Sequence, residues 1–403
     1  MWRATADQCV MVLRVLNGQN RSISDLSPQR QIPITGQSYD SLQTRLKLIV
    51  HKPLSCILPS TTIMRAFSFI LGLLASMSAN STPLLSRTTS PPPTTQLIYQ
   101  FPNGTWLENL AIRPTGQILV TVLTAPELWQ VTPGYNSSQH VLDTNSSKPL
   151  GSATLVSRIP DVTGLLGIVE MQQLDVFYAI AGNFSLANLT STNGSYSIWK
   201  IDMRRPSAVV SKLTDIPEGV SLNGMAALNK SQGLLVVGDA GAGVVYTLNV
   251  QTGNYSKTID DPTMKPNSSF PLGINGIKVY DGYLYYTSEA QELYNRIPIN
   301  TTSGIATGPA ETIATNIFGD DFSLDQAGDA YIGENIRDVV VKITPGGNVS
   351  VVAGSLNSTL VAGATSTAFG RTSGNESVLY VTTSGGLGSP VGEEGGKVVA
   401  IYL

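Results

Sequence analysis

The feature that most constrains this chain is a short stretch that recurs along it. Residues 273–289 have the sequence GINGIKVYDGYLYYTSE, in which two apolar runs are joined by Tyr280, Asp281 and Gly282. An Asp-Gly pair between two β-rich runs is a strong hairpin signal, because glycine accepts the positive φ of a tight turn. The stretch therefore predicts a β-hairpin.

Five related stretches occur elsewhere: RPTGQILVT (113–121), GIVEMQQLDVFYAIAG (167–182), NKSQGLLVVGD (229–239), DQAGDAYIGE (325–334) and AFGRTSGNESVLYVTTSGG (368–386). The turn centres of the six copies are separated by roughly 46 to 59 residues, which is the spacing of propeller blades. The sequence therefore predicts an all-β, six-bladed β-propeller over residues 96–403. We expect blades at roughly 105–150, 151–212, 213–262, 263–313, 314–355 and 356–403.

The strands that flank the hairpins complete this architecture. A lone strand, QLIYQF at 96–101, precedes the first blade, and we expect it to pair with the last blade, because such pairing removes exposed edges. Apolar and polar residues alternate in five further runs, as expected of strands between neighbouring blades. These predicted outer strands are Glu127–Val131, Tyr196–Ile201, Val244–Val250, Leu293–Ile299 and Val339–Ile343.

Composition supports a turn-rich β protein and excludes some partners. Only 13% of the residues are charged, 42% are hydrophobic, and the chain has 38 glycines and 23 prolines. The net charge of -3 gives no electrostatic reason to expect nucleic acid or an anionic membrane as a partner.

The amino-terminal region predicts export. Residues 64–79 have one arginine, a short apolar run and then small residues, the pattern of a signal peptide. The alternatives are a buried helix or a membrane anchor, but the apolar run is short for a bilayer. Residues 80–95 form a Pro/Ser/Thr linker. Residues 1–63, which contain both cysteines, are either a gene-model extension or a genuine, disordered amino-terminal segment.

Glycosylation sequons also indicate the secretory pathway, and we expect a secreted or vesicular protein without a stable membrane anchor. A single Asn-X-Ser/Thr sequence means little, but many of them favour export through a eukaryotic secretory route. The predicted acceptors are Asn80, Asn103, Asn136, Asn145, Asn183, Asn188, Asn193, Asn229, Asn254, Asn267, Asn300, Asn348, Asn357 and Asn375.

Four blades place a metal-competent side chain where the innermost strand begins: Glu108, Asn223, Asn275 and Asp320. Innermost strands surround the axis of a propeller, so equivalent positions converge on one centre. Carboxylate and amide oxygens suit Ca²⁺ or a similar divalent ion. Taken singly, each residue is explained as well by a turn or a loop cap. The recurrence of all four in register favours a common site.

The quartet and its blade positions resemble the SMP-30/gluconolactonase/LRE-like propellers, in which a Glu, two Asn and an Asp hold a divalent metal. The resemblance implies a metal-dependent lactonase or esterase in which Asp320 activates water. The residues that follow Glu108 and Asp320 depart from the family's pattern, which argues against small sugar lactones.

The motifs ENLAIRPTGQILVT, GINGIKVYDGYLYYT and AFGRTSGNESVLYVTTSGG resemble more closely a fungal, secreted branch. That branch is similar to the hetero-Diels-Alderases that join a tropolone-derived quinone methide to the sesquiterpene humulene in meroterpenoid biosynthesis. The resemblance implies a cyclase that requires no cofactor and acts on a small hydrophobic substrate. A third alternative is a non-catalytic small-molecule-binding propeller.

A cyclase of this kind needs a dry pocket and a donor that polarises the enone oxygen. The sequence supplies pocket candidates near the ends of the innermost strands: Trp106, Leu107, Met225, Tyr285, Tyr286, Phe318, Phe322 and Phe369. Arg371 is the predicted donor, or else it neutralises Asp320 and Asp321. Aromatic residues in a β core are most often structural, and this alternative applies to each of them.

Overall fold

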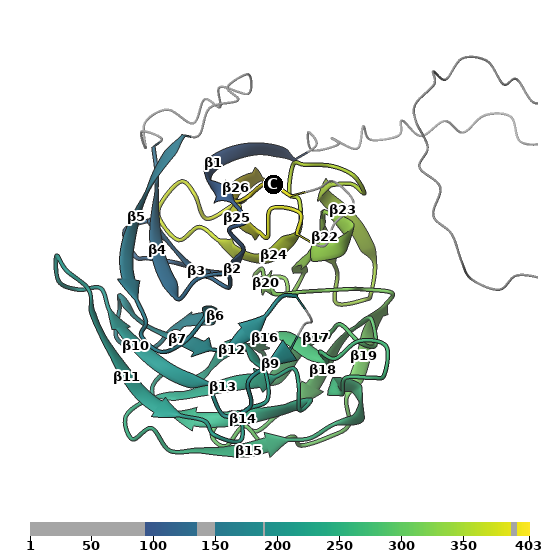
Figure 1. Cartoon of the computed structure of the whole chain (residues 1–403). Helices are drawn as coiled ribbons and strands as arrows, with labels where there is room; N and C mark the ends of the chain where they lie inside the picture. Colours follow the sequence, from purple (N-terminus) through teal and green to yellow (C-terminus); the bar gives the residue numbers. More distant parts are fainter. Residues whose placement is uncertain (1–92, 135–149, 188–189, 388–392) are drawn as a thin grey trace, which may run out of the picture. The chain divides into compact units, whose positions relative to one another are not determined.

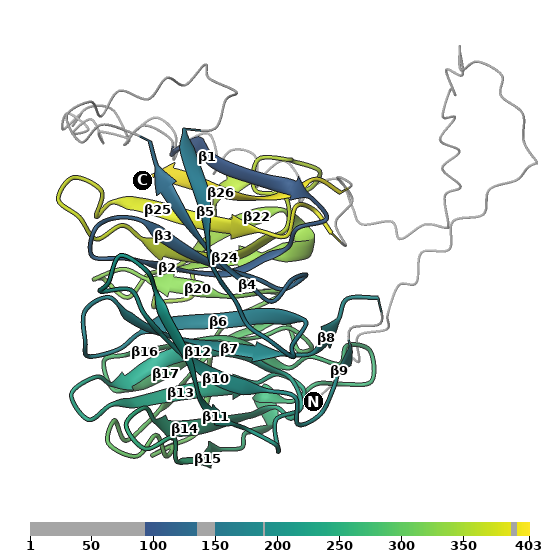
Figure 2. The ribbon, with the colours of Figure 1, turned by 60° about the vertical axis from the view of Figure 1, so that its left-hand side comes forward.

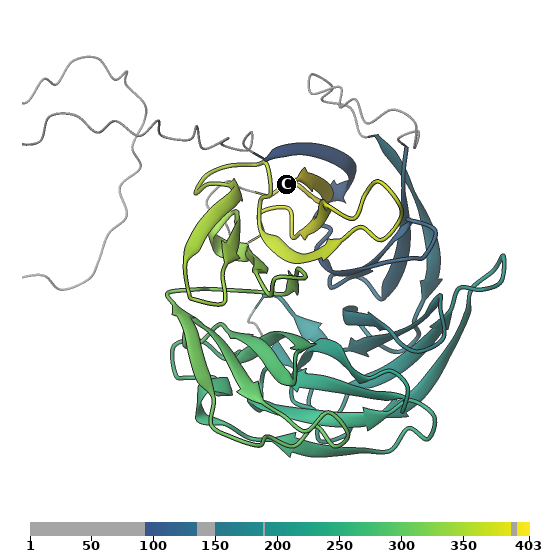
Figure 3. The ribbon, with the colours of Figure 1, turned by 180° about the vertical axis from the view of Figure 1, so that it is seen from behind.

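The computed structural model describes residues 93–134, 150–187, 190–387 and 393–403. These residues form six four-stranded antiparallel sheets around a common axis, with two short 3-10 helices (Figure 1). The sheets surround the same axis when seen from behind (Figure 3). The predicted six-bladed, all-β propeller is therefore confirmed. No helix in the described part of the chain is long and apolar enough to cross a membrane.

Each of the first five blades is a sheet of four strands that follow one another from the axis outward. Blade one contains β2 (Leu107–Ile112), β3 (Ile118–Val122), β4 (Glu127–Pro133) and β5 (Gly151–Arg158). Blade two contains β6 (Gly164–Glu170), β7 (Val176–Gly182), β10 (Ser197–Asp202) and β11 (Val209–Asp215). Blade three contains β12 (Leu222–Asn229), β13 (Leu234–Asp239), β14 (Val244–Asn249) and β15 (Tyr255–Ile259).

The remaining elements complete the ring. Blade four contains β16 (Ile274–Tyr280), β17 (Tyr283–Ser288), β18 (Leu293–Pro298) and β19 (Glu311–Thr315). Blade five contains β20 (Phe322–Leu324), β21 (Ala330–Glu334), β22 (Val339–Ile343) and β23 (Val349–Gly354). Outside the blades lie the short pair β8 (Phe184–Ser185) and β9 (Thr190–Ser191), and the helices η1 (Pro262–Met264) and η2 (Asn335–Arg337).

The sixth blade combines the two ends of the described chain. It contains β24 (Ala364–Phe369), β25 (Val378–Thr383) and β26 (Gly395–Tyr402), with β1 (Thr94–Asn103) as its outermost strand. β1 pairs antiparallel with β26, and Figure 2 shows the two strands side by side. β1 begins within the predicted linker. The rest of that linker, the predicted signal peptide and residues 1–63 lie outside the described residues.

The hairpin at residues 273–289 forms as predicted, and it is the inner pair of blade four. Strands β16 and β17 pair in a register that places Tyr280 opposite Tyr283. The two turn residues between them, Asp281 and Gly282, have φ values of 48° and 78°. This is the left-handed backbone that a tight hairpin turn requires.

The predicted outer strands are in fact the third strands of their blades. The true outermost strands are β5, β11, β15, β19 and β23, which are largely exposed or half-buried along their length. Their sequences, such as YSKTI and ETIAT, are short and mostly polar. A one-sided strand of this kind gives a weak apolar signal, so the predicted blade boundaries cut blades one and two short.

Buried side chains form six hydrophobic clusters, and each cluster lies between two neighbouring blades. Successive side chains of a strand point to opposite faces of its sheet. Tyr286 therefore joins the cluster between blades three and four, whereas its neighbour Tyr285 joins the cluster between blades four and five. The core thus lies between the blades and not along the axis.

The predicted glycosylation acceptors differ in exposure. Asn103, Asn193, Asn254, Asn267, Asn300, Asn348 and Asn357 are exposed, and Asn183 and Asn229 are half-buried. Asn375 is 6% exposed, and its side-chain oxygen accepts a hydrogen bond from the Thr372 amide. A glycan on Asn375 is incompatible with this packing, so the prediction of Asn375 as a glycosylation acceptor is wrong. Asn80, Asn136, Asn145 and Asn188 lie outside the described residues.

Glycines allow the innermost strands of adjacent blades to touch. A Cβ on Gly224 would lie 2.2 Å from the carbonyl oxygen of Asn275, and one on Gly276 would lie 2.6 Å from the Cα of Asp321. Neither glycine has a positive φ. The Asn-Gly pairs at 223–224 and 275–276 are therefore not turns, because their glycines serve the close approach of two backbones.

Replacing Gly276 by alanine should destabilise the propeller, because the new methyl group meets backbone atoms that cannot rotate away. We expect the free energy of unfolding to fall by about 1–3 kcal/mol, as for other overpacked interiors. Urea denaturation followed by fluorescence would measure the change. Gly346→Ala is the matched control, because its Cβ would meet nothing closer than 3.9 Å. Equal stability of the two variants would contradict the prediction.

Candidate functional site

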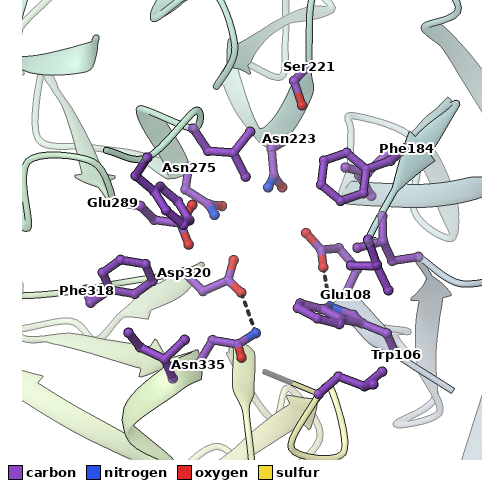
Figure 4. A pocket seen from close by; sticks show the side chains of 17 residues that line it. Trp106, Glu108, Phe184, Ser221, Asn223, Asn275, Glu289, Phe318, Asp320 and Asn335 are labelled. Carbon is purple, nitrogen blue, oxygen red and sulfur yellow. Dashed lines mark hydrogen bonds between the residues drawn. The ribbon is translucent and has the colours of Figure 1, made fainter. Parts of the chain in front are cut away.

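A cavity of about 350 Å³ lies where the innermost strands begin. Figure 4 shows polar side chains pointing toward its centre, with apolar side chains around them. All six blades, or loops attached to them, contribute to its lining. The lining residues are Trp106, Glu108, Leu123, Leu166, Phe184, Leu186, Ser221, Asn223, Phe270, Leu272, Asn275, Glu289, Phe318, Asp320, Asn335, Ile336 and Leu387.

β-Bulges place three members of the predicted quartet. The pairing register of β2 skips Glu108, that of β12 skips Asn223, and that of β16 skips Asn275. A bulged residue is unpaired and leaves the alternation of its strand, so its side chain can be redirected. Asp320 precedes β20, and its backbone N–H donates to the carbonyl of Gly333. All four line the same cavity, as their recurrence predicted.

Two further polar residues of the cavity, Glu289 and Asn335, were not predicted from the sequence. We call the polar lining residues the floor of the cavity: Glu108, Ser221, Asn223, Asn275, Glu289, Asp320 and Asn335. Glu289 lies directly after β17 and Asn335 directly after β21, so both follow the second strand of a blade. A signal near this position was present, since the second strands of blades three, four and five run into VVGD, YTSE and YIGE. In blade three, Asp239 is the last residue of β13 and lies one position before the equivalent of Glu289, because it pairs with Leu222 as Ser288 pairs with Ile274. It accepts hydrogen bonds from the backbone N–H groups of Val220 and Ser221.

Hydrogen bonds fix part of the polar floor. The Trp106 indole Nε1 donates to Glu108 Oε2 at 2.6 Å, and Asn335 Nδ2 donates to Asp320 Oδ2 at 3.4 Å. Two buried oxygens of the floor, Asn275 Oδ1 and Glu289 Oε2, have no partner among the described residues. The floor is therefore only partly satisfied by the protein itself.

Burial changes the acidity of the three floor carboxyl groups. It raises the pKa of Glu108 to about 7 and the pKa of Glu289 to about 8, against the usual 4.5. Burial also raises the pKa of Asp320 well above its usual range, and the charges of Glu108 and Glu289 add to this effect. Desolvation and mutual repulsion both disfavour the ionised forms. In the metal-free protein the floor therefore holds protons at neutral pH.

Nine aliphatic or phenylalanine side chains and the ring of Trp106 form the wall of the cavity. Phe318 packs edge-on against Phe270, with ring centroids 5.2 Å apart. Phe184 and Leu186 follow β7 and cover the side of blade two. Pockets for small organic molecules are mostly apolar with a few placed polar groups, and this cavity has that arrangement.

Of the eight predicted pocket residues, Trp106 and Phe318 line this cavity. The other six belong to the cores between blades or pack against them: Leu107, Met225, Tyr285, Tyr286, Phe322 and Phe369. The Tyr286 hydroxyl lies 2.6 Å from that of Thr263, and Phe369 packs edge-on against Tyr331. Alternation along each strand turns these side chains toward a flanking blade, so closeness to an innermost strand does not place them on the axis.

Arg371 does not line the cavity. It follows β24, at the other end of the innermost strands, and donates to Glu170 Oε2 at 2.6 Å and to the carbonyl of Ile112. It does not neutralise the aspartates either, because Lys278 lies 2.5 Å from Asp321 Oδ1. Arg371 thus ties together blades six, two and one far from Asp320.

The chemistry of the quartet fits a divalent cation, although no three His, Cys, Asp or Glu side chains in the described part are grouped to hold one. The fit depends instead on a mixed set of two carboxylates and two amides, which supply hard oxygen donors. The unpartnered Asn275 Oδ1 is an available amide oxygen of this set. Metal binding by Glu108, Asn223, Asn275 and Asp320 stays a prediction.

No protein-family model matches the chain. A protein of Phoma sp. named "Putative hetero-Diels-Alderase" is 26% identical over 317 residues, covering 71% of this chain and 86% of that protein. A protein of Sarocladium schorii with the same description is 23% identical over 327 residues, covering 71% of this chain and 77% of that protein. The chain is a homologue of these proteins. The predicted resemblance to the hetero-Diels-Alderases is therefore confirmed.

Solved structures share the fold. A luciferin-regenerating enzyme superposes with a TM-score of 0.53 at 14% identity, covering 77% of this chain and 95% of that one. A protein described as a "putative gluconolactonase" gives a TM-score of 0.51 at 17% identity, covering 77% and 92%. At these identities the likeness shows the common propeller architecture alone.

The raised pKa values of Glu108 and Glu289 allow a prediction of how the free energy of unfolding depends on pH. In EDTA-containing buffer, the free energy of unfolding should fall as the pH rises from about 4.5 to about 8, because the folded state binds more protons there than the unfolded state. The stability from these raised pKa values is fully present below 4.5 and is lost as the pH passes the folded values. Urea denaturation at a series of pH values measures the slope.

Glu289→Gln should make this fall shallower, because glutamine cannot ionise in the buried site. Glu376→Gln is the matched control, since Glu376 is exposed. The prediction is contradicted if stability rises over this pH range, or if the control changes the slope as much as Glu289→Gln does.

Proposed function

We propose that the chain is a secreted-pathway cyclase that catalyses a hetero-Diels-Alder reaction in fungal meroterpenoid biosynthesis. In this proposal it joins a tropolone-derived quinone methide to a humulene-type sesquiterpene. One observation carries the proposal: a single cavity combines an apolar wall with a floor of proton-bearing carboxyl groups. Homology to proteins named as hetero-Diels-Alderases supports it.

The proposed reaction makes few chemical demands. The two ends of the O=C–C=C unit of the enone react with the two carbons of an alkene: the oxygen forms a C–O bond and the β-carbon forms a C–C bond. No atom leaves, no electrons are transferred, and no net proton transfer takes place. Catalysis then consists of holding two apolar partners in a reactive geometry and stabilising the charge that develops on the oxygen.

The wall supplies the positioning. Phe184, Phe270 and Phe318 present rings to the cavity together with leucines from several blades. A hydrocarbon partner gains free energy by leaving water for such a surface. Both partners are then confined in one space, which removes much of the entropic cost of their encounter.

The floor supplies the donor that Arg371 was predicted to be. A protonated carboxyl group can donate a hydrogen bond to a carbonyl oxygen, and the pKa of Glu108, about 7, and that of Glu289, about 8, keep a large fraction protonated near neutral pH. The apolar wall lowers the local dielectric, which strengthens this hydrogen bond. Glu108 is held for this task by Trp106.

A metal-dependent lactonase is the second candidate, favoured by the convergence of the quartet from four blades. A bound divalent ion would polarise the lactone carbonyl. Asp320 would have to be ionised to take a proton from water, whereas its raised pKa keeps it neutral in the metal-free protein. The lactonase therefore requires metal, and the cyclase does not. Binding without turnover is the third alternative.

The two enzymatic proposals separate in one assay. Purified protein is incubated with a quinone-methide precursor and humulene, and separately with lactones, each time once in EDTA and once with Ca²⁺ in excess, and the products are resolved by chiral chromatography. The cyclase proposal expects one predominant stereoisomer of the adduct in EDTA. Phe318→Ala should lower kcat/KM for the adduct about tenfold or more, because it removes part of the wall.

Leu174→Ala is the matched control, because Leu174 is an apolar residue that is 65% exposed and does not line the cavity. A racemic adduct formed at the uncatalysed rate would refute the cyclase proposal. Lactone hydrolysis that depends on added Ca²⁺ would favour the second candidate.

A further inference from the structure

Two oxygens of the cavity floor are buried without a hydrogen-bond partner among the described residues, Asn275 Oδ1 and Glu289 Oε2. Asn275 is 2% exposed and Glu289 is 6% exposed, and both residues line the cavity. Polar atoms in a protein interior are almost always paired, so an unpaired one marks a strained position or a missing ligand. Two of them together in a cavity point to a ligand.

The two oxygens come from adjacent positions of one blade. Asn275 lies in the bulge of β16, and Glu289 directly follows β17. Ile274 pairs antiparallel with Ser288, so Glu289 lies opposite Gly273 and Asn275 lies one residue further into the sheet. The backbone N–H of Glu289 donates to the carbonyl of Gly273, which fixes the start of its loop. Figure 4 shows both side chains at the same side of the cavity.

The other polar groups of the floor already have partners. Trp106 donates to Glu108 Oε2, and Asn335 donates to Asp320 Oδ2. The Ser221 hydroxyl lies 2.9 Å from the Ser191 hydroxyl. Each of these side chains has at least one partner, whereas the fully buried floor oxygens without a partner both lie on blade four, and the wall around them is apolar.

We propose that Asn275 and Glu289 form a polar subsite that takes two adjacent oxygen functions of the ligand, at least one of them a hydroxyl. The carbon skeleton of the ligand then lies against the apolar wall. This subsite deepens the proposed function, on which it rests, by naming the polar end of the substrate. A hydroxyl donates to Asn275 Oδ1, and the neighbouring oxygen function exchanges a hydrogen bond with Glu289.

An oxygen-bearing ring fits this arrangement better than a cationic ligand does. An ammonium group would satisfy both acceptors, but the apolar wall would strip its water shell and leave its remaining donors unpaired. A planar ring with two neighbouring oxygen functions keeps its polar atoms on one edge. The rest of such a ring presents only carbon to Phe270, Leu272 and Phe318.

Two probes of the same skeleton test the subsite: 2,3-dihydroxynaphthalene, and 2,3-dimethoxynaphthalene, which cannot donate. Binding of each to the purified chain is measured by titration calorimetry in EDTA. We expect the dihydroxy probe to bind at least about tenfold more tightly, because a site built to pair a hydroxyl rejects analogues that lack one. This comparison uses the unmodified chain and does not depend on any variant folding.

Variants then locate the preference. Asn275→Leu should reduce the ratio of the two dissociation constants to about threefold or less without weakening the dimethoxy probe, because the amide oxygen of Asn275 pairs only with a donor. Ser221→Ala is the matched control, because Ser221 also lines the floor but its hydroxyl is already paired. It should keep the full ratio. Thermal unfolding of each variant verifies that it is folded.

Several results would overturn the subsite. These are equal binding of the two probes by the unmodified chain, no binding of either, tighter binding of 2-naphthylmethylammonium, or a preference that survives Asn275→Leu. The proposed reaction fails separately. Hydroxyl preference without any cyclised adduct contradicts the cyclase and supports the subsite, whereas cyclisation with equal binding of the two probes contradicts the subsite alone.

Discussion

Contact between the backbones of neighbouring innermost strands is the constraint on which this propeller depends. Gly224 and Gly276 leave no room for a side chain between one strand and the next. The same positions carry the bulges that turn Asn223 and Asn275 toward the axis. The same Asn-Gly positions therefore bring the strands close together and direct the polar side chains to the axis. A wider ring would also move the floor residues apart.

This close packing also brings three carboxyl groups together in the floor of the cavity. Glu108, Glu289 and Asp320 are brought together without a cation beside them in the described part, since Lys278 is used by Asp321. Such a cluster reaches neutrality by holding protons, by binding a cation, or by pairing with a ligand. The chemistry of the cavity is thus set by which of these three occupies it, and the apolar wall favours a neutral occupant.

The sequence alone was sufficient for the repeat, the six blades and the convergence of Glu108, Asn223, Asn275 and Asp320, because these depend on spacing and register. It was not sufficient for the wall. Tyr285 and Tyr286 are adjacent in the chain yet face different blades, and no local pattern tells which face meets a cavity. Acidic motifs lie near the floor residues that follow the second strands, but the register decides which acid reaches the cavity: Asp239, one position earlier than the equivalent of Glu289, serves a loop instead.

The pairing of β1 with β26 also determines the order in which the molecule can be completed. The ribosome makes the partner of Thr94–Asn103 about 300 residues after that strand, which at usual rates of synthesis takes roughly 15 to 60 s. Five blades can form during that time, but the sixth lacks two of its four strands until β25 and β26 emerge. Ring closure is therefore necessarily the last step of assembly, and loss of the eight-residue strand β26 would leave β1 without a partner and β25 paired only with β24.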